Sequence, residues 1–264
     1  MIKRCDQMDK LKKLFNVLIG LVLLIAVWQA LIFIGKYDEV LFPSPLKVWE
    51  GILTLIKDGT IFIHFQVSLM RFLIGYLLAV VTAVVLGLIL GRLKKLWDIL
   101  DPIAQVLRPV SPIAWSPFIV LWFGIGDIPA IVIIFIAAFF PVLLSTVSAV
   151  RKVDKMYLKV AQNFEIKQSQ LLRKIIFPAS FPYIANGLHI AVGTAWIFLV
   201  AGEMVGAQSG LGYLIVDARN SLRLDLVLAG IIFIGVSGLI LDRAIGLFEK
   251  WIQKQCGRSS SASN

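Results

Sequence analysis

Residues 71–92 read RFLIGYLLAVVTAVVLGLILGR, with an arginine at each end and twenty uncharged residues between them. At a rise of 1.5 Å per residue, twenty helical residues measure about 30 Å, which is the thickness of the hydrocarbon core of a bilayer. Within that core, only helices and closed barrels satisfy their own backbone hydrogen bonds. The segment therefore predicts a transmembrane helix.

The rest of the chain repeats this pattern. Of its 264 residues, 59% are hydrophobic and 16% are charged, whereas a soluble domain has about half apolar and about a quarter charged residues. Five further apolar runs occupy residues 14–35, 109–126, 128–150, 175–202 and 226–248. Three prolines break the run 109–126, and only Asp242 and Arg243 interrupt the last run. The sequence predicts an all-α membrane protein with six transmembrane helices.

The net charge of +10 is concentrated in patches between the apolar runs. With the N-terminus inside, 18 of the 26 Lys and Arg residues fall in cytoplasmic segments, as the positive-inside rule requires. This division gives a cytoplasmic tail at 1–13, a transmembrane domain at 14–250 with an inner loop at 151–181, and a second cytoplasmic tail at 251–264. We expect a multi-pass protein of the cell membrane with both termini in the cytoplasm. Its partner by charge is the lipid bilayer, and not a nucleic acid.

The sequence offers little chemistry of its own. Cys5 and Cys256 lie near opposite ends and form neither a disulfide framework nor a four-ligand metal site. The chain has no Gly-x4-Gly-Lys-Ser/Thr motif, the loop with which many ATPases hold phosphates. Metalloprotease and serine hydrolase motifs are missing as well. We expect no cofactor, no metal, no catalytic residue and no enzyme activity in this chain.

The inner loop has the most specific spacing in the chain. It carries Lys159 and Ala161, then Glu165, and nine residues later Ile175-Ile176-Phe177-Pro178. Two short helices in this loop, ended by Pro178 and Pro182, would form a rigid cytoplasmic lever. The alternative from charge alone is a solvated basic loop held at anionic lipid.

This spacing resembles the EAA loop of ATP-binding-cassette (ABC) importer permeases, in which Glu-Ala-Ala, Gly and Ile-x-Leu-Pro form helices that dock on the ATPase. Ala161, Ile175 and Pro178 match that pattern, while Phe177 stands for leucine, Lys159 for glutamate and Glu165 for glycine. The resemblance therefore implies that Ala161, Glu165, Ile175, Phe177 and Pro178 couple the chain to an ATPase. The departures at Lys159 and Glu165 concern the details of docking.

The resemblance extends from about residue 41 to residue 250 and narrows to the permeases for aliphatic sulfonates, taurine and nitrate. The residues that carry it are Leu41-Phe42-Pro43-Ser44-Pro45, His64, Ser68, Leu69, Arg71, Asp101-Pro102, Ala114-Trp115-Ser116-Pro117, Leu121 to Gly126, Phe140-Pro141, Ala195-Trp196, Glu203-Met204, Gly210 to Leu214, and Asp217 to Asn220.

This resemblance implies the type I permease fold of an ABC importer. Such a permease works as a dimer, here expected to be a homodimer, with two cytoplasmic ABC ATPases and an extracytoplasmic substrate-binding protein. The implied cargo is a small oxyanion, with aliphatic sulfonates or taurine first and nitrate second. A permease of the same class for a vitamin or pyrimidine precursor is the alternative.

Two ionisable residues near span ends are candidates for the translocation pathway, because uncompensated charge is costly in a membrane. Glu203 follows the uncharged run that begins at Ile175, and it either serves an outer gate or ends a helix beside an arginine. Arg71 opens the span quoted above. It is either a snorkelling anchor or a guanidinium that attracts an anionic substrate.

The broken run 109–126 supplies further pathway candidates. Its three prolines, Pro109, Pro112 and Pro117, cannot continue one regular helix. Broken backbone at membrane depth lines cavities in many transporters. Ser111, Trp115 and Ser116 are therefore pathway candidates, together with Trp196; the alternative for both tryptophans is packing or an interfacial belt. Two small-xxx-small pairs, Gly87 with Gly91 and Gly202 with Gly206, predict close helix packing.

A competing enzyme interpretation starts from Gly124-Ile125-Gly126-Asp127, which matches the Gly-x-Gly-Asp of presenilin-like intramembrane aspartyl proteases. Tyr37-Asp38 would supply the second carboxylate, and two carboxylates sharing a proton can catalyse hydrolysis. The charge bias places both aspartates at the outer ends of their spans. There they cannot work on a membrane-embedded peptide bond.

Overall fold

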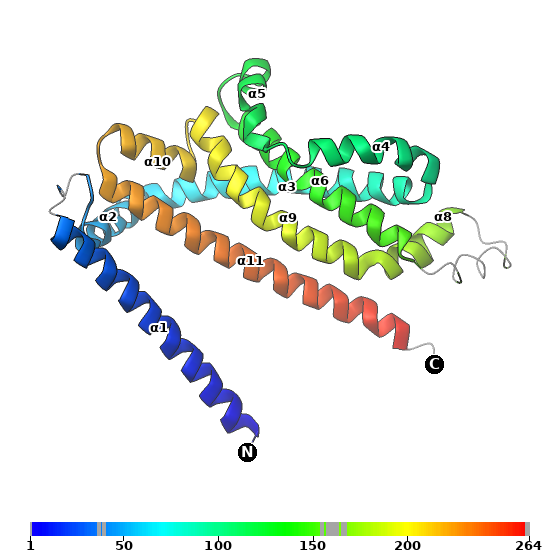
Figure 1. Cartoon of the computed structure of the whole chain (residues 1–264), viewed down its shortest axis with the longest axis horizontal. Helices are drawn as coiled ribbons and strands as arrows, with labels where there is room; N and C mark the ends of the chain where they lie inside the picture. The colour runs from blue at the N-terminus through cyan, green and yellow to red at the C-terminus, as the bar shows by residue number, and fades with distance from the viewer. Residues whose placement is uncertain are drawn as a thin grey trace. The chain divides into compact units, whose positions relative to one another are not determined.

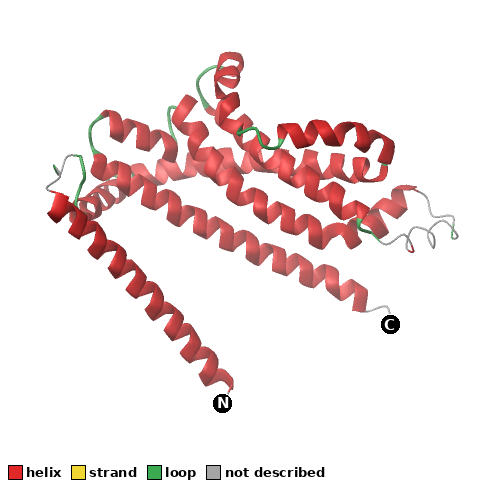
Figure 2. Cartoon of the chain, in the orientation of Figure 1, coloured by secondary structure: helices red, strands yellow, loops and turns green. Residues whose placement is uncertain are grey.

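The computed structural model describes residues 2–35, 38, 41–153, 156, 164 and 168–261. Every regular element within these residues is a helix, as Figure 2 shows. The expectation of an all-α protein is confirmed. The chain divides into two compact units, residues 1–61 with 215–232 and residues 62–214 with 233–264.

The first unit contains α1 (Ile2–Gly35) and α2 (Pro45–Lys57), with parts of α10 (Leu211–Asn220) and α11 (Leu224–Ser261). Ser44 caps α2 by accepting the backbone N–H of Lys47 at 3.4 Å, and Pro45 occupies the first turn, where its missing N–H costs nothing. The buried residues of α2, Val48, Gly51 and Leu55, recur at helical spacing. This is the amphipathic pattern of a helix that packs on one face only.

The second unit is built around α3 (Thr60–Arg92), α6 (Asp127–Arg151) and α9 (Phe177–Gly206). Helices α6 and α9 pack along much of their length (Figure 1). The shorter elements of this unit are α4 (Lys94–Leu107), η1 (Pro112–Trp115), α5 (Ser116–Phe123), α8 (Gln168–Leu171) and the π-helical turn η2 (Leu172–Ile176).

Glycines let the three long helices approach closely. A methyl group added at Gly87 of α3 would lie 2.6 Å from Thr146 Cβ on α6, and one at Gly91 would lie 2.7 Å from Val150 Cβ. On α9, Gly202 and Gly206 likewise face the start of α6. Both small-xxx-small pairs therefore lie at helix contacts, which confirms the packing that their spacing predicts.

Four helices of the described chain are long and apolar enough to cross a membrane: Thr60–Arg92, Asp127–Arg151, Lys174–Gly206 and Leu224–Leu247. A fifth span is formed if α4 and the segment Pro112–Phe123, which meet at a bend of 87°, count as one broken span. In α1 the apolar helical stretch is Val22–Gly35. The number six stays a prediction.

The proline-rich run has the broken backbone that its sequence predicts. The α-helix α4 ends at Leu107, a short 3-10 turn begins at Pro112, and α5 starts at Ser116. The run was expected to cross the membrane between residues 109 and 126, but its α-helical part is only eight residues long, about 12 Å. Residues 109–126 are therefore too short to span alone, and α4 must supply the remainder of any broken span.

Candidate functional site

The most completely bonded charge in the described chain is Arg71, three turns into α3. Its residue exposure is 3%. Its Nε donates to Asp127 Oδ1 at 2.9 Å and its Nη1 to Glu203 Oε1 at 2.8 Å. The remaining N–H groups reach Asp127 Oδ1 at 2.5 Å and both the backbone oxygen and the hydroxyl of Ser209, at 2.6 and 2.7 Å. All five guanidinium donors are thus engaged.

Glu203, at the end of α9, is the buried partner of this arginine. It is 1% exposed. Its carboxylate accepts from Arg71, from the Ser68 hydroxyl at 2.7 and 2.9 Å, and from the Gly212 backbone N–H at 2.9 Å. Gly212 is the second residue of α10, so the carboxylate also lies at a helix N-terminus, where negative charge is stabilised. A buried charge needs this degree of compensation to be tolerated.

One face of α3 holds the loop that follows α9. His64, Ser68 and Arg71 are spaced four and three residues apart, which places them on one side of the helix. The N–H of Gly210 donates to His64 Nδ1 at 3.0 Å, and that of Leu211 donates to Ser68 Oγ at 2.8 Å. Gly210 has φ +102°, a backbone conformation that favours glycine. We call Arg71, Asp127, Glu203, Ser68 and Ser209 the outer clamp, after the side of the membrane on which the charge bias of the sequence predicts this end to lie.

The Gly-x-Gly-Asp sequence is a turn between α5 and α6. Gly124 and Gly126 have φ of +74° and +146°, values that side chains rarely tolerate. The N–H of Gly126 donates to the Gly206 carbonyl at 2.8 Å, which ties this turn to the end of α9. The turn places Asp127 at the first position of α6, where its carboxylate meets Arg71 although the side chain is 67% exposed.

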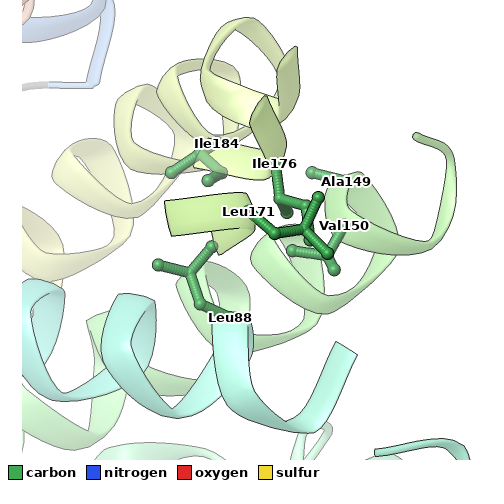
Figure 3. Close-up of a cluster of buried hydrophobic side chains, with 6 residues drawn as sticks. All are labelled: Leu88, Ala149, Val150, Leu171, Ile176 and Ile184. Atoms are coloured by element: carbon green, nitrogen blue, oxygen red, sulfur yellow. The ribbon is translucent and has the colours of Figure 1, made fainter. Parts of the chain in front are cut away.

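The inner segment is anchored by a hydrophobic cluster, drawn in Figure 3. Leu171 and Ile176 are buried against the C-terminal ends of α3 and α6 and the first turns of α9; the other members are Leu88, Ala149, Val150 and Ile184. Ile175 packs against the same cluster. Phe177 is partly exposed and meets Phe181 edge to face at 5.8 Å, and Pro178 is exposed. Ala161 and Glu165 lie outside the described residues.

The expectation that Pro178 and Pro182 end the inner helices is wrong. The chain is helical without interruption from α8 through η2 into α9. Pro178 follows the π-helical turn η2 directly, so its missing N–H removes one backbone bond of a helix that nevertheless continues. Pro182 lies inside α9 and removes only one backbone bond. The part of the loop that the structure describes, α8 with η2, is therefore continuous with α9.

The other pathway candidates are scattered over the second unit. Ser111 is exposed and precedes η1. Trp115 is 38% exposed beside Phe118, whereas Ser116 is buried. Trp196 is buried; its indole N–H donates to the Ile234 carbonyl at 3.2 Å, and its ring meets Phe72 at 5.6 Å. Pathway roles for these four residues stay predictions.

The structure brings Arg71 and Glu203 together, 132 residues apart in sequence. Sequence reasoning named both, and it named the helix-ending carboxylate beside an arginine as one interpretation of Glu203. It missed Asp127 as a partner of Arg71 and the roles of Ser68 and Ser209. The helical spacing of His64, Ser68 and Arg71 was the available signal. The described residues contain no group of three His, Cys, Asp or Glu side chains that could hold a metal ion.

The long apolar helices are those of a polytopic membrane protein. Residues 83–254 match the family model described as binding-protein-dependent transport system inner membrane component. An aliphatic sulfonates transport permease of Bacillus subtilis is 36% identical over 88% of this chain and 84% of its own length. The taurine transport system permease of Escherichia coli is 33% identical over 87% of this chain and 86% of its own. A nitrate import permease of Synechocystis sp. is 34% identical over 91% of this chain and 90% of its own length.

The chain belongs to the family of binding-protein-dependent transport system inner membrane components. It is therefore the permease subunit of an ABC importer and not itself an enzyme. This membership removes the support for the aspartyl protease interpretation. The two glycines of that motif are accounted for by the turn geometry described above.

Proposed function

We propose that this chain forms the translocation pathway for a small oxyanion, with aliphatic sulfonates or taurine first and nitrate second. The observation that carries the proposal is the identity to sulfonate, taurine and nitrate permeases, which extends over about nine tenths of the chain in each case. A vitamin or pyrimidine precursor is the alternative cargo within the same class. The binding protein of the importer sets most of the specificity.

The mechanism that we propose is alternating access driven by ATP closure in partner ATPases. Closure pushes on residues 153–178, and the cluster around Leu171 and Ile176 passes this movement to α3, α6 and α9. The continuity of η2 with α9 supports such a rigid transmission. At the opposite end, the outer clamp holds the loop after α9 closed until the helices separate.

The proposed assembly contains two copies of this chain, two cytoplasmic ABC ATPases and one extracytoplasmic binding protein. Co-expression with the cognate ATPase is expected to give a complex of two permease chains and two ATPase chains. Light scattering of the purified complex measures its mass. The purified chain alone is expected to hydrolyse no ATP, because it lacks a phosphate-binding loop. As a control, the chain is also purified from cells that lack the cognate ATPase. ATP hydrolysis by that preparation would refute this assignment.

The proposed orientation places both termini in the cytoplasm and predicts a labelling pattern. In a chain with Cys5 and Cys256 replaced by serine, Thr60→Cys and Gln208→Cys are expected to react with an impermeant thiol reagent added to intact cells. Met156→Cys is expected to react only after the membrane is opened. The reverse pattern would invert the topology and with it the position of the coupling segment.

A further inference from the structure

A cavity of about 350 Å³ lies between α6 and α9 in the second unit. Its polar lining comes from Arg108, Ser145, Ser148, Lys152, Tyr183 and Asn186. The volume is at the lower end of the 300–1,000 Å³ typical of ligand pockets. The lining runs along α6 from Pro141 to Lys152, the residue that follows the helix, about 16 Å along the helix axis. The cavity therefore reaches from the helix end into the apolar part of the span.

The charged residues that line this cavity are all cations. Arg108 and Lys152 line it, and none of its described lining residues is acidic. Three other arginines of the described chain have carboxylate partners: Arg71 with Glu203, Arg151 with Asp98, and Arg223 with Asp225. By contrast, no ion pair joins Arg108 or Lys152 to a described carboxylate; Lys152 Nζ lies 5.4 Å from the centre of the Tyr183 ring.

Arg108 and Lys152 are both exposed, so an anion from the water can reach them, and no described carboxylate competes for their charge. Arg108 follows the last residue of α4, at the break before η1, and broken helices are where many transporters place their binding sites. Gly187 keeps α9 close to α6 here, because a Cβ at this position would collide with Ser145. The break and the close approach thus shape a polar cavity within a hydrophobic protein.

We propose that this cavity is an oxyanion-binding site on the translocation path, with Arg108 and Lys152 as its cationic ligands. The guanidinium offers paired donors that match two oxygens of a sulfonate or nitrate. The ammonium and the hydroxyls of Ser145 and Ser148 supply further donors. Which anion binds here rests on the proposed function, whereas the prediction that the cavity attracts anions rests on its lining alone. The clamp arginine, with all five donors engaged, has none left for the cargo in this conformation.

A charged thiol reagent tests the site directly. Ser148→Cys, in the full chain with Cys5 and Cys256 replaced by serine, places a thiol in the cavity. We compare its rate with anionic 2-sulfonatoethyl methanethiosulfonate and with the cationic trimethylammonium analogue, each relative to a free thiol. The anionic reagent is expected to be favoured about tenfold or more. Taurine or nitrate should slow the reaction.

The double variant Arg108→Gln/Lys152→Gln should bring this preference close to one. Arg151→Gln is the matched control, because it removes the neighbouring cation that pairs with Asp98 outside the cavity, and it should leave the preference unchanged. A preference near one in the parent chain, or one that the double variant retains, overturns the proposal.

A lipid phosphate has the same chemistry as a free oxyanion, so the labelling is repeated in vesicles of phosphatidylcholine with and without phosphatidylglycerol. Protection by taurine or nitrate in phosphatidylcholine alone supports the proposal. Protection by phosphatidylglycerol, with none from the free anions, would assign the cavity to a lipid headgroup and overturn it.

Transport by the reconstituted importer separates this inference from the proposed function. The double variant is expected to lower the maximal uptake of taurine or nitrate about tenfold or more, while KM, which the binding protein sets, changes less than about twofold. Normal uptake by the double variant would overturn the inference and leave the proposed function intact. If the parent importer takes up neither anion, the proposed function fails, and the labelling still decides whether the cavity binds oxyanions.

Discussion

Arg71→Leu is expected to lower the free energy of unfolding by about 3–5 kcal/mol, because it leaves Glu203 charged and buried without its cation. The substitution also removes every guanidinium bond to Asp127 and Ser209, so the loop after α9 loses its attachment to α3. Thermal unfolding of the purified chain in detergent, followed by circular dichroism, measures the change.

Two comparison variants identify the cause. Arg223→Leu removes an arginine whose partner Asp225 is only two residues away and whose side chain is half exposed, so a loss of less than about 1 kcal/mol is expected. Arg71→Leu/Glu203→Leu removes both buried charges and should recover part of the lost stability. If Arg71→Leu is no more harmful than Arg223→Leu, the outer clamp does not stabilise the fold.

Ile176→Ala is expected to reduce coupled transport by the reconstituted importer about tenfold or more. Ile176 is 2% exposed in the cluster that anchors the inner segment, and truncating such a side chain costs about 2–5 kcal/mol. When the ATPases close, the segment around Ile176 should then move without moving the helices it packs on, so ATP is hydrolysed with little transport. Uptake and phosphate release, measured on the same proteoliposomes, give the transport per ATP.

Ile197→Ala is the matched control, because it makes the same change in α9, the helix into which η2 continues, at a side chain that is 66% exposed. It should leave transport per ATP unchanged. Complex assembly with the ATPase must also be measured for Ile176→Ala. Normal transport per ATP in an assembled Ile176→Ala importer would show that the cluster does not transmit the movement.

The sequence predicts the structure best where the length and composition of a single segment decide its conformation. The run from Arg71 to Arg92 predicts a spanning helix, and α3 covers that whole range. The paired glycines at 87 and 91 predict a close contact, and both meet α6. The prolines were harder to interpret, because their effect depends on position. Pro112 begins a new turn, whereas Pro178 lies in the first turn of α9 and Pro182 is accommodated inside it.

The site was less accessible from sequence because its bonds join distant elements. Arg71 and Glu203 each stood out as a charge beside an apolar run, but no local pattern links them or adds Asp127. Arg108 was harder still to identify. Its position beside a proline break was visible, but only the fold brings it to the same cavity as Lys152. Local physics therefore identified the helices and several candidates, and tertiary contacts decided which charges meet.

The enclosure of the Arg71–Glu203 pair has a consequence for the ionic strength at which the protein works. At 0.1 M salt, mobile ions screen exposed charges over about 10 Å, but they screen buried pairs much less. The Arg71–Glu203 pair, with both side chains almost fully buried, should hold equally well in dilute and in saline media, whereas the contact with the exposed Asp127 is open to screening. An open cationic cavity has no such shelter, so added salt should weaken its attraction for anions. Sensitivity to salt would then originate in the handling of the cargo and not in the closure of the outer end.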